Sequence, residues 1–361
     1  MSRTRPRSHP LFRVLAACLA RCLVACLAAC LAWIPAGFAQ SEREQALTKK
    51  DPAEAEFERR VEEMLNSVVR IRMKAVEDAR SSETLGPARV GSGIVIDPGW
   101  VLTIGYLIIE PDSIEVTASN RKTLPATLAG NDHATGFGLL KLQRDLGVKA
   151  QPLGDSSALA LREPVIVAPF GGQDTASLAQ VTAKRRFTGS WEYLLDSAIF
   201  TAPATDGWAG AALVNRDLKL VGVGSLLVRN AAEPDALLLG NMFVPTDLLK
   251  PILAQLKAQG RVAGPQRPWL GLATEEMRGR LLVTRVSPES PADQSGILQG
   301  DVVVSIGGQA VKTHVELYEK LWKLGAAGVE VPMKILRGVD ERDVRVKSID
   351  RIEYFKAKKP L

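Results

Sequence analysis

Cysteine and histidine are scarce in this 361-residue sequence, and this limits the chemistry that the chain can perform. The four cysteines share a four-residue spacing near the N-terminus: Cys18, Cys22, Cys26 and Cys30. This spacing would place them on one helix face, as a metal site requires, but small apolar residues in an export signal explain it more simply. Beyond residue 39 the chain has no cysteine, and therefore no disulfide or thiolate, and only two histidines, His133 and His314.

An excess of charge of one sign is also missing. The formal net charge is +6, but five arginines precede residue 40, where no acidic residue occurs. Without them 41 basic residues face 40 acidic ones, a net charge of +1. This balance gives no electrostatic reason to expect nucleic acid as a partner. No metal-ligand spacing or cofactor motif stands out, and the "GSG" at 91–93 is too short for a nucleotide loop, so we expect no metal and no cofactor.

Residues 1–39 have the pattern of a secretory signal peptide. An arginine-bearing start precedes an apolar stretch, and the small residues Gly37 and Ala39 stand before a cleavage position at Gln40. This pattern predicts export to a bacterial periplasm or cell envelope. Because Arg21 interrupts the apolar stretch, an uncleaved N-terminal membrane anchor is the alternative. Residues 40–56 are polar and charged, and we interpret them as a flexible leader.

Short apolar runs separated by turn residues fill residues 57–245. A helical spacing from Phe57 leads into the strand "VVRIRM", and strand patterns follow without a long helix between them. This favours an all-β barrel or sandwich. The stretch "PTDLLKPILAQLKAQG" predicts a helix with Thr246 as its cap and Gly260 as its stop, and residues 246–264 form a linker helix and linker.

Residues 265–350 have a different pattern, a small β-rich module with one or two helices. It contains the strand "GRLLVTRV", a helical turn in "SPADQSGI", a strand pair around Gly307 and Gly308, and the amphipathic helix "THVELYEKLWKL". Two further strands close the module. Residues 351–361 remain as a basic tail.

The order of these motifs resembles the HtrA/Deg-type proteases. The segments that carry the resemblance are "GSGIVIDPGWVLT", "QPLGDSSALALREPVIVAPFG", "FVPTDLLKPILAQL" and "WLGL…SPADQSGILQGDVVVSIGGQAV", spread over residues 55–348. The resemblance implies an all-β dominated fold, with a trypsin-like double β-barrel at 57–245 followed by a PDZ domain at 265–350.

The same resemblance places the catalytic triad on residues that cannot perform its chemistry. The family's histidine, aspartate and serine positions correspond here to Tyr106, Gly136 and Ala209. The loop "TDGWAGAALVN" thus looks like a nucleophile loop without its nucleophile, with Gly207, Trp208 and Ala209 as a remnant oxyanion loop. Trp208 either fills the vacant cleft or lines an apolar peptide groove. We expect no catalytic residue and a silent site.

A relocated catalytic site is the alternative to a silent one. His133 stands three residues before Gly136, and it would need to reach Ser92 or Ser225 across the cleft. In that case the chain is an active serine-type endopeptidase. Otherwise His133 is a histidine of a surface loop.

The PDZ resemblance implies that peptide binding is the remaining activity. PDZ domains add a peptide to a sheet edge and bind its terminal carboxylate through loop amides. The resemblance assigns the carboxylate loop to Trp269, Leu270, Gly271 and Leu272. His314, Tyr318 and Leu321 lie on the face of the helix beside the groove. His314 either contacts a ligand or is an exposed neighbour of the helix cap, with the other two residues in the core.

The implied partners are C-termini of peptides or unfolded proteins. The corresponding role is adaptor, chaperone or regulator in envelope protein quality control, and an active protease relative is a further candidate partner. The family also implies a homotrimer, assembled near Phe57. A structural protein whose barrels merely carry the PDZ domain is a third possibility.

Overall fold

The computed structural model describes residues 51–355. The predicted signal peptide or anchor, the four cysteines, most of the leader and the end of the tail lie outside these residues. The chain divides into two compact units, Met1–Ala55 and Glu56–Leu361, and the architecture below is that of the second unit.

The predicted transition from helix to strand at the start of the described chain is confirmed. Helix α3 (Pro52–Asn66) is followed by strand β1 (Val68–Ala75). The helix begins at Pro52, inside the segment that we interpreted as a flexible leader. Proline suits the first turn of a helix because its missing N–H would have no partner there, and the Asp51 carboxylate accepts a hydrogen bond from the Ala53 amide at 2.9 Å.

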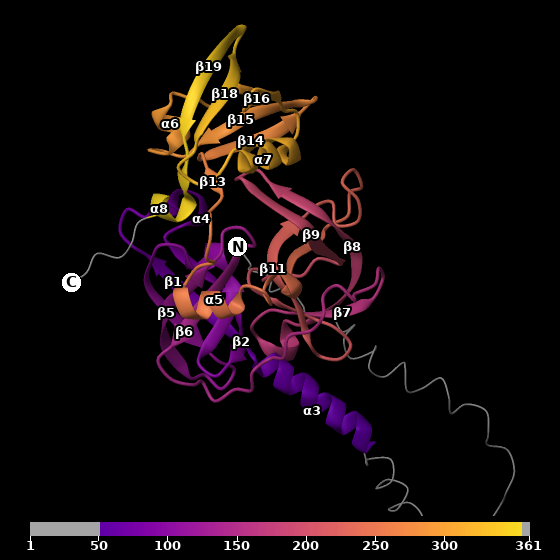
Figure 1. The fold of residues 1–361 in the computed structure, drawn as a ribbon. Helices are drawn as coiled ribbons and strands as arrows, with labels where there is room; N and C mark the ends of the chain where they lie inside the picture. Colours follow the sequence, from indigo (N-terminus) through magenta and orange to yellow (C-terminus); the bar gives the residue numbers. More distant parts are fainter. Residues whose placement is uncertain (1–50, 356–361) are drawn as a thin grey trace, which may run out of the picture. The chain divides into compact units, whose positions relative to one another are not determined.

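Two closed β-barrels follow, each of six antiparallel strands (Figure 1). The first has the strand order β1-β2-β3-β6-β5-β4 and includes the short helices α4 and η1. Its other elements are α4 (Ser82–Leu85), β2 (Ala88–Asp97), β3 (Trp100–Ile104), η1 (Gly105–Ile108), β4 (Pro111–Thr117), β5 (Thr123–Asn131) and β6 (Phe137–Leu142).

The second barrel has the strand order β10-β11-β12-β9-β8-β7. Its elements are β7 (Pro164–Ala168), η2 (Gly172–Asp174), β8 (Ser177–Gly189), β9 (Tyr193–Ala202), β10 (Ala212–Val214), β11 (Leu220–Val228) and β12 (Gly240–Pro245). Strands β8 and β9 form a long hairpin, in which residues 190–192 make the turn.

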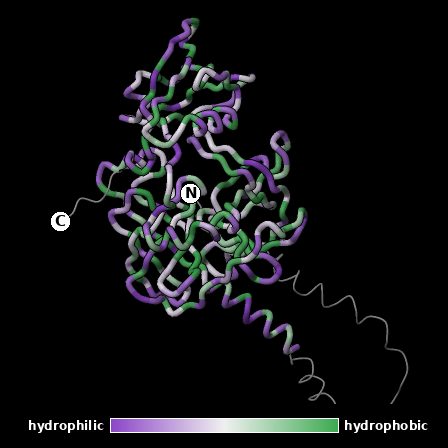
Figure 2. Tube along the Cα trace, in the orientation of Figure 1, coloured by the Kyte–Doolittle hydropathy of each residue, from purple (hydrophilic) through white to green (hydrophobic). Residues whose placement is uncertain are grey.

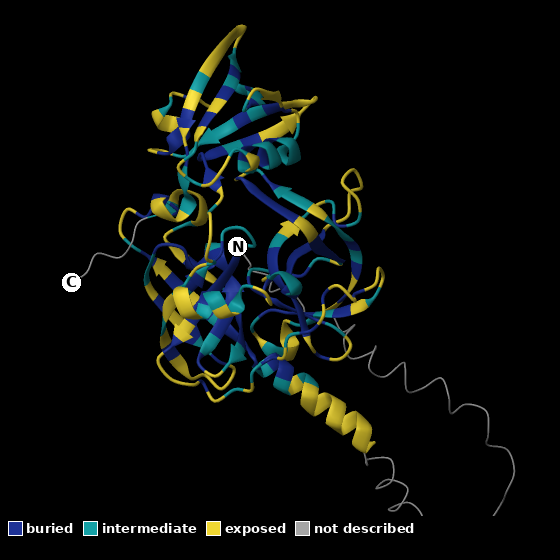
Figure 3. Cartoon of the chain, viewed as in Figure 1, coloured by how far each residue is buried: buried dark blue, intermediate teal, exposed yellow. Residues whose placement is uncertain are grey.

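The barrels form because their strands bury apolar side chains inside. Figure 2 shows hydrophobic and hydrophilic residues following one another along the strands. Figure 3 shows that many residues of the barrel strands are buried. The largest fully buried side chains of the barrels include Phe137, Phe200 and Phe243. A closed barrel also pairs its edge strands, which leaves no open ladder of backbone groups.

The single linker helix predicted from Thr246 to Gly260 is wrong. The chain forms a 3₁₀ turn, η3 (Thr246–Leu248), and then helix α5 (Leu253–Gln259). Pro251 has no amide to donate and disfavours helical geometry before it, so one continuous helix cannot form. Thr246 does not cap the turn, because its hydroxyl bonds the Leu220 carbonyl at 3.3 Å. Gly260 does end α5, in a left-handed conformation with φ of 74°.

The C-terminal module contains the elements predicted for residues 265–350. Its sheet has the order β14-β15-β16-β18-β19, which places β14 at an edge. The elements are β13 (Pro268–Trp269), β14 (Leu272–Met277), β15 (Arg280–Val286), α6 (Pro291–Gln294), β16 (Val302–Ile306), β17 (Gln309–Ala310), α7 (His314–Lys323), β18 (Glu330–Arg337), β19 (Asp340–Lys347) and β20 (Ile349–Asp350).

Part of the predicted basic tail is structured. Residues Arg351–Tyr354 form the short helix α8, whose cap is the Asp350 side chain. Tyr354 is buried, and its ring centroid lies 4.7 Å from that of Trp269. The tail therefore begins with residues that pack against the module.

Candidate functional site

Tyr106 lies in η1, directly after β3, and it spans the space between the two barrels. Its hydroxyl donates a hydrogen bond to the Ser225 carbonyl in β11 at 2.8 Å. Burial raises the pKa of this phenol well above its ordinary value, and the neighbouring Trp208 side chain opposes the rise only in part. The group is therefore neutral and already uses its proton, so it cannot act as a general base near neutral pH.

Gly136 lies between β5 and β6, beside Tyr106, and the structure fills the space next to it with a tyrosine. The Tyr193 hydroxyl donates to the Thr135 carbonyl at 2.5 Å. A Cβ at Gly136 would lie 2.9 Å from this hydroxyl, and its φ of 86° is unfavourable for any residue with a side chain. Tyr106, Gly136 and Tyr193 line one small cavity of about 60 Å³.

The loop that contains Ala209 makes backbone hydrogen bonds to both barrels, to β2 of the first and to β11 of the second. The Ala209 carbonyl accepts from the Ser92 amide at 2.8 Å, and the Gly210 amide donates to the Gly224 carbonyl at 2.8 Å. A Cβ at Gly210 would lie 1.9 Å from the Ser92 carbonyl oxygen, so this loop requires glycine there. The half-buried Trp208 lies next to the Tyr106 hydroxyl, and thus faces the cleft.

His133 lies in the turn between β5 and β6, as the loop alternative expects, but its side chain is half-buried. Its ring packs against Phe355 with centroids 5.6 Å apart, and burial lowers its pKa to about 3, helped by the nearby Arg351. Within residues 51–355 it makes no hydrogen bond to Ser92 or Ser225, and Ser92 Oγ accepts instead from the Phe170 amide at 2.9 Å. His133 and Ser225 do line the same small cavity.

The predicted carboxylate loop binds a carboxylate within this structure. The amides of Leu270, Gly271 and Leu272 donate to the Glu192 carboxylate at 2.9, 2.7 and 2.9 Å. Gly271 has φ of 89°, and a Cβ there would lie 2.3 Å from the Ser290 Cβ. Only glycine therefore allows three successive amides to point at one anion here.

Trp269 differs from the other three residues of the predicted loop. It is buried in β13, which pairs with β20, and its ring packs on Tyr354. Its amide is not one of the donors to Glu192. The structure therefore assigns Trp269 to packing beneath the loop.

Helix α7 begins as predicted, with the Thr313 side chain as its cap. His314 Nε2 lies 2.9 Å from the Thr274 carbonyl, to which it can only donate, and its ring stacks on Tyr318. Tyr318 and Leu321 are both 0% exposed and belong to the module core, as in the alternative interpretation. The Tyr318 hydroxyl nevertheless donates to the Gly189 carbonyl at 2.7 Å.

Glu192 is the site residue that sequence analysis missed. It stands in the turn of the β8–β9 hairpin, where a charged residue is ordinary. Its partner Leu270 is 78 residues away in the chain. No local pattern signals this contact.

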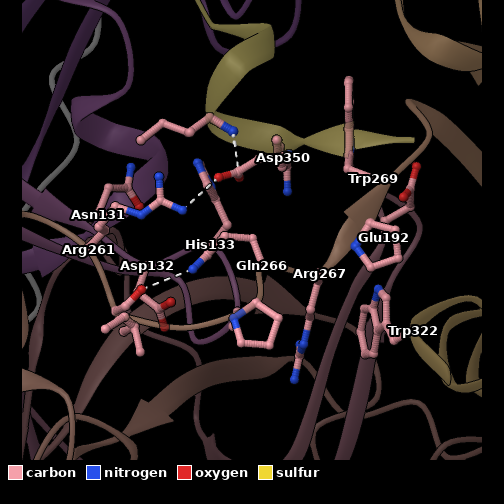
Figure 4. A pocket seen from close by; sticks show the side chains of 17 residues that line it. Asn131, Asp132, His133, Glu192, Arg261, Gln266, Arg267, Trp269, Trp322 and Asp350 are labelled. Carbon is pink, nitrogen blue, oxygen red and sulfur yellow. Dashed lines mark hydrogen bonds and ion pairs between the residues drawn. The ribbon is translucent and has the colours of Figure 1, made fainter. Parts of the chain in front are cut away.

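Two larger cavities flank this contact. One of about 170 Å³ is shown in Figure 4, where Asn131 and Arg261 lie on the side opposite Glu192 and Trp322. Arg261 pairs with Asp350 at 3.1 Å. The other cavity, of about 500 Å³, is lined mainly by apolar surface and extends from Tyr106 to the carboxylate loop.

No group of three or more His, Cys, Asp or Glu side chains between residues 51 and 355 is placed to hold a metal ion. None of the helices in that range combines the length and apolar character needed to cross a bilayer.

Two family models match the chain. Residues 91–223 match a trypsin-like peptidase domain, and residues 268–348 match a PDZ domain. The protein thus combines a trypsin-like pair of barrels with a C-terminal PDZ domain, and its fold is dominated by β-strands.

Curated relatives and solved structures agree with this architecture. A probable periplasmic serine endoprotease DegP-like of Hahella chejuensis is 30% identical over 274 residues, which cover 71% of this chain and 56% of the relative. A probable periplasmic serine protease do/HhoA-like of Haemophilus influenzae is 27% identical over 276 residues, which cover 72% of this chain and 58% of the relative. The chain thus spans about half the length of these relatives.

Among solved structures, a variant of the HtrA-type protease AlgW with a tripeptide has a TM-score of 0.50 and 20% identity. The match covers 82% of this chain and 97% of that one, and it shows the fold alone. Together the comparisons show that this chain is similar to DegP-like and HtrA-type proteases over a trypsin-like peptidase domain and a PDZ domain.

Proposed function

We propose that this chain is an exported HtrA-type pseudoprotease that captures C-termini of peptides or unfolded proteins through its PDZ groove. The observation that carries this proposal is the set of three successive amides, from Leu270, Gly271 and Leu272, that converge on one carboxylate. A terminal carboxylate has the same charge and the same two acceptor oxygens. Strand β14, at the edge of the sheet, leads away from these amides and suits the addition of a peptide strand.

The chemistry of the cleft supports a silent site. Tyr106, Gly136 and Ala209 provide neither a base, nor a carboxylate, nor a nucleophile at the positions that the family resemblance assigns. Loss of serine or histidine costs about 2 × 10⁶ in kcat in a well-studied serine protease. From a typical turnover of about 10 per second, this leaves on the order of one event per day or slower.

The biological role follows from the binding activity. An exported protein that holds chain ends without cutting them acts as an adaptor, chaperone or regulator in envelope quality control, and an active relative is a candidate partner. The periplasmic names of the relatives support this location. Assembly as a trimer near Phe57, which is 50% exposed, belongs to the same proposal.

An active serine endopeptidase with a relocated site is the second candidate. It is favoured by the small cavity that His133 shares with Ser225. However, a pKa of about 3 makes His133 a weak base, since it binds a proton poorly at neutral pH.

Two measurements on the purified protein test the proposal. We expect a short labelled peptide with a free C-terminal carboxylate to bind, its C-terminally amidated form to bind much more weakly, and unfolded casein to remain intact overnight. Equal binding of both peptides would refute capture of C-termini. Cleavage of casein that is lost with a serine-directed inhibitor and in His133→Ala would establish the second candidate instead.

A further inference from the structure

The turn of the β8–β9 hairpin lies in the groove that the proposed function assigns to a peptide. The Glu192 carboxylate accepts hydrogen bonds from all three loop amides, with Oε1 shared by Gly271 and Leu272 and Oε2 facing Leu270. Glu192 is 8% exposed and has φ of 59°, an uncommon conformation for a residue with a side chain. The hairpin turn thus presents a side-chain carboxylate where a peptide would present its terminal one.

The backbone of the turn also imitates a bound peptide. The Thr274 amide on β14 donates to the Ser190 carbonyl at 3.1 Å. This is the kind of main-chain bond that an added strand makes with a sheet edge. The Thr274 carbonyl is bonded by His314, so both backbone groups of this residue have partners.

Two further contacts anchor the hairpin on the PDZ side. The Tyr318 hydroxyl donates to the Gly189 carbonyl at 2.7 Å and accepts from the Glu192 amide at 3.2 Å. Leu194 is 6% exposed and belongs to the apolar cluster of the PDZ domain, although it lies in a barrel strand. Carboxylate, backbone and apolar side chain therefore all engage the same domain.

We propose that residues 189–194 are an intramolecular ligand of the PDZ groove, so that a peptide binds only after the hairpin withdraws. This rests on the proposed function, because it concerns access to the same groove. The Glu192 carboxylate and the terminal carboxylate of a peptide would both accept hydrogen bonds from the same three loop amides, and the amides cannot bind both at once. The measured affinity for a peptide is therefore the intrinsic affinity reduced by the fraction of molecules with a withdrawn hairpin.

The test compares the full-length chain with its Glu192→Ala variant. Alanine removes every side-chain acceptor from the loop amides, so the hairpin loses its main hold on the groove. We expect this variant to bind a fluorescein-labelled peptide that ends in leucine with a free carboxylate at least about tenfold more tightly. The matched control is Glu233→Ala, an exposed position in the same barrel, which should bind like the wild type.

Hydrogen exchange of the wild-type protein provides a measurement that needs no variant. Saturating peptide should speed exchange in residues 189–194 while the loop at 270–272 stays protected. Equal affinity of the wild type and Glu192→Ala, with unchanged exchange in the hairpin, would overturn the intramolecular ligand and leave peptide capture standing. Binding by neither protein would instead overturn the proposed function, and the competition with it.

Discussion

The affinity of the PDZ groove for a peptide should rise with pH in the wild type and stay flat in Glu192→Ala. Burial raises the pKa of the docked Glu192 carboxyl to about 7, from an ordinary value of 4.5. The bonds from the loop amides and the nearby Arg351 oppose this rise but do not cancel it. Docking therefore favours the protonated carboxyl.

The sign and size of the pH effect on peptide affinity follow from the difference between the docked and the ordinary pKa of Glu192. A group whose pKa is raised on docking stabilises the docked hairpin fully below pH ~4.5, and this stabilisation is lost as the pH rises through about 7. The difference corresponds to about 3 kcal/mol, or on the order of a hundredfold in the docking equilibrium. Because a withdrawn hairpin frees the groove, the peptide should bind more tightly at about pH 8 than at about pH 5.

The pH profile of the affinity can report Glu192 only if titration of the other groups near its carboxyl is accounted for. The buried Tyr318 stays neutral, because its pKa is raised, and His133 stays neutral because its pKa is about 3. The other charged groups that line the same pocket are Asp132, Arg261, Arg267, Asp350 and Arg351. His314 packs on Tyr318 and lies 3.4 Å from the Glu276 carboxylate. All remain in Glu192→Ala, so the difference between the two pH profiles isolates Glu192.

The assay is fluorescence anisotropy with the leucine-ending peptide across this pH range. Its free carboxylate is ionised throughout, so the probe itself does not titrate. Parallel pH profiles for the wild type and Glu192→Ala, or a wild-type affinity that falls as the pH rises, would refute the reasoning.

Three further outcomes are expected. Gly210→Ala should lower the free energy of unfolding by about 2 kcal/mol or more in urea titration, because its Cβ would collide with the Ser92 carbonyl and φ is positive; an unchanged midpoint would contradict the loop geometry. Gly271→Ala should abolish peptide binding by turning the loop amides away, and retained affinity would show that the glycine is dispensable. The combined variant Tyr106→His, Gly136→Asp and Ala209→Ser, at the positions that the resemblance assigns to the triad, should stay inert on casein, because Tyr193 occupies the space beside Gly136. Activity of this variant without an added Tyr193→Phe change would contradict the expectation.

Much of the secondary structure could be predicted from local patterns. The alternating and continuous apolar runs of the barrels, the strand pair around Gly307 and Gly308, and the helix after Thr313 all appear where the sequence places them. These elements depend on neighbours within a few residues, so periodicity and capping residues are enough to find them. The linker helix failed for an equally local reason, since Pro251 interrupts it.

Contacts between residues far apart in the sequence fill both the cleft between the barrels and the carboxylate loop of the PDZ domain. Tyr193 reaches Thr135 across 58 residues, and Tyr106 reaches Ser225 across 119. The role of Glu192 could not be predicted from the sequence, because a charged residue in a turn is ordinary. Its partners come close only when the barrel hairpin packs on the PDZ domain. The apolar patterns of the sequence predicted an all-β barrel or sandwich and a separate β-rich module, and the family resemblance added the second barrel and the carboxylate-binding loop. Tertiary structure decided that the loop is occupied, because a carboxylate and three amides meet only when separate elements fold against one another.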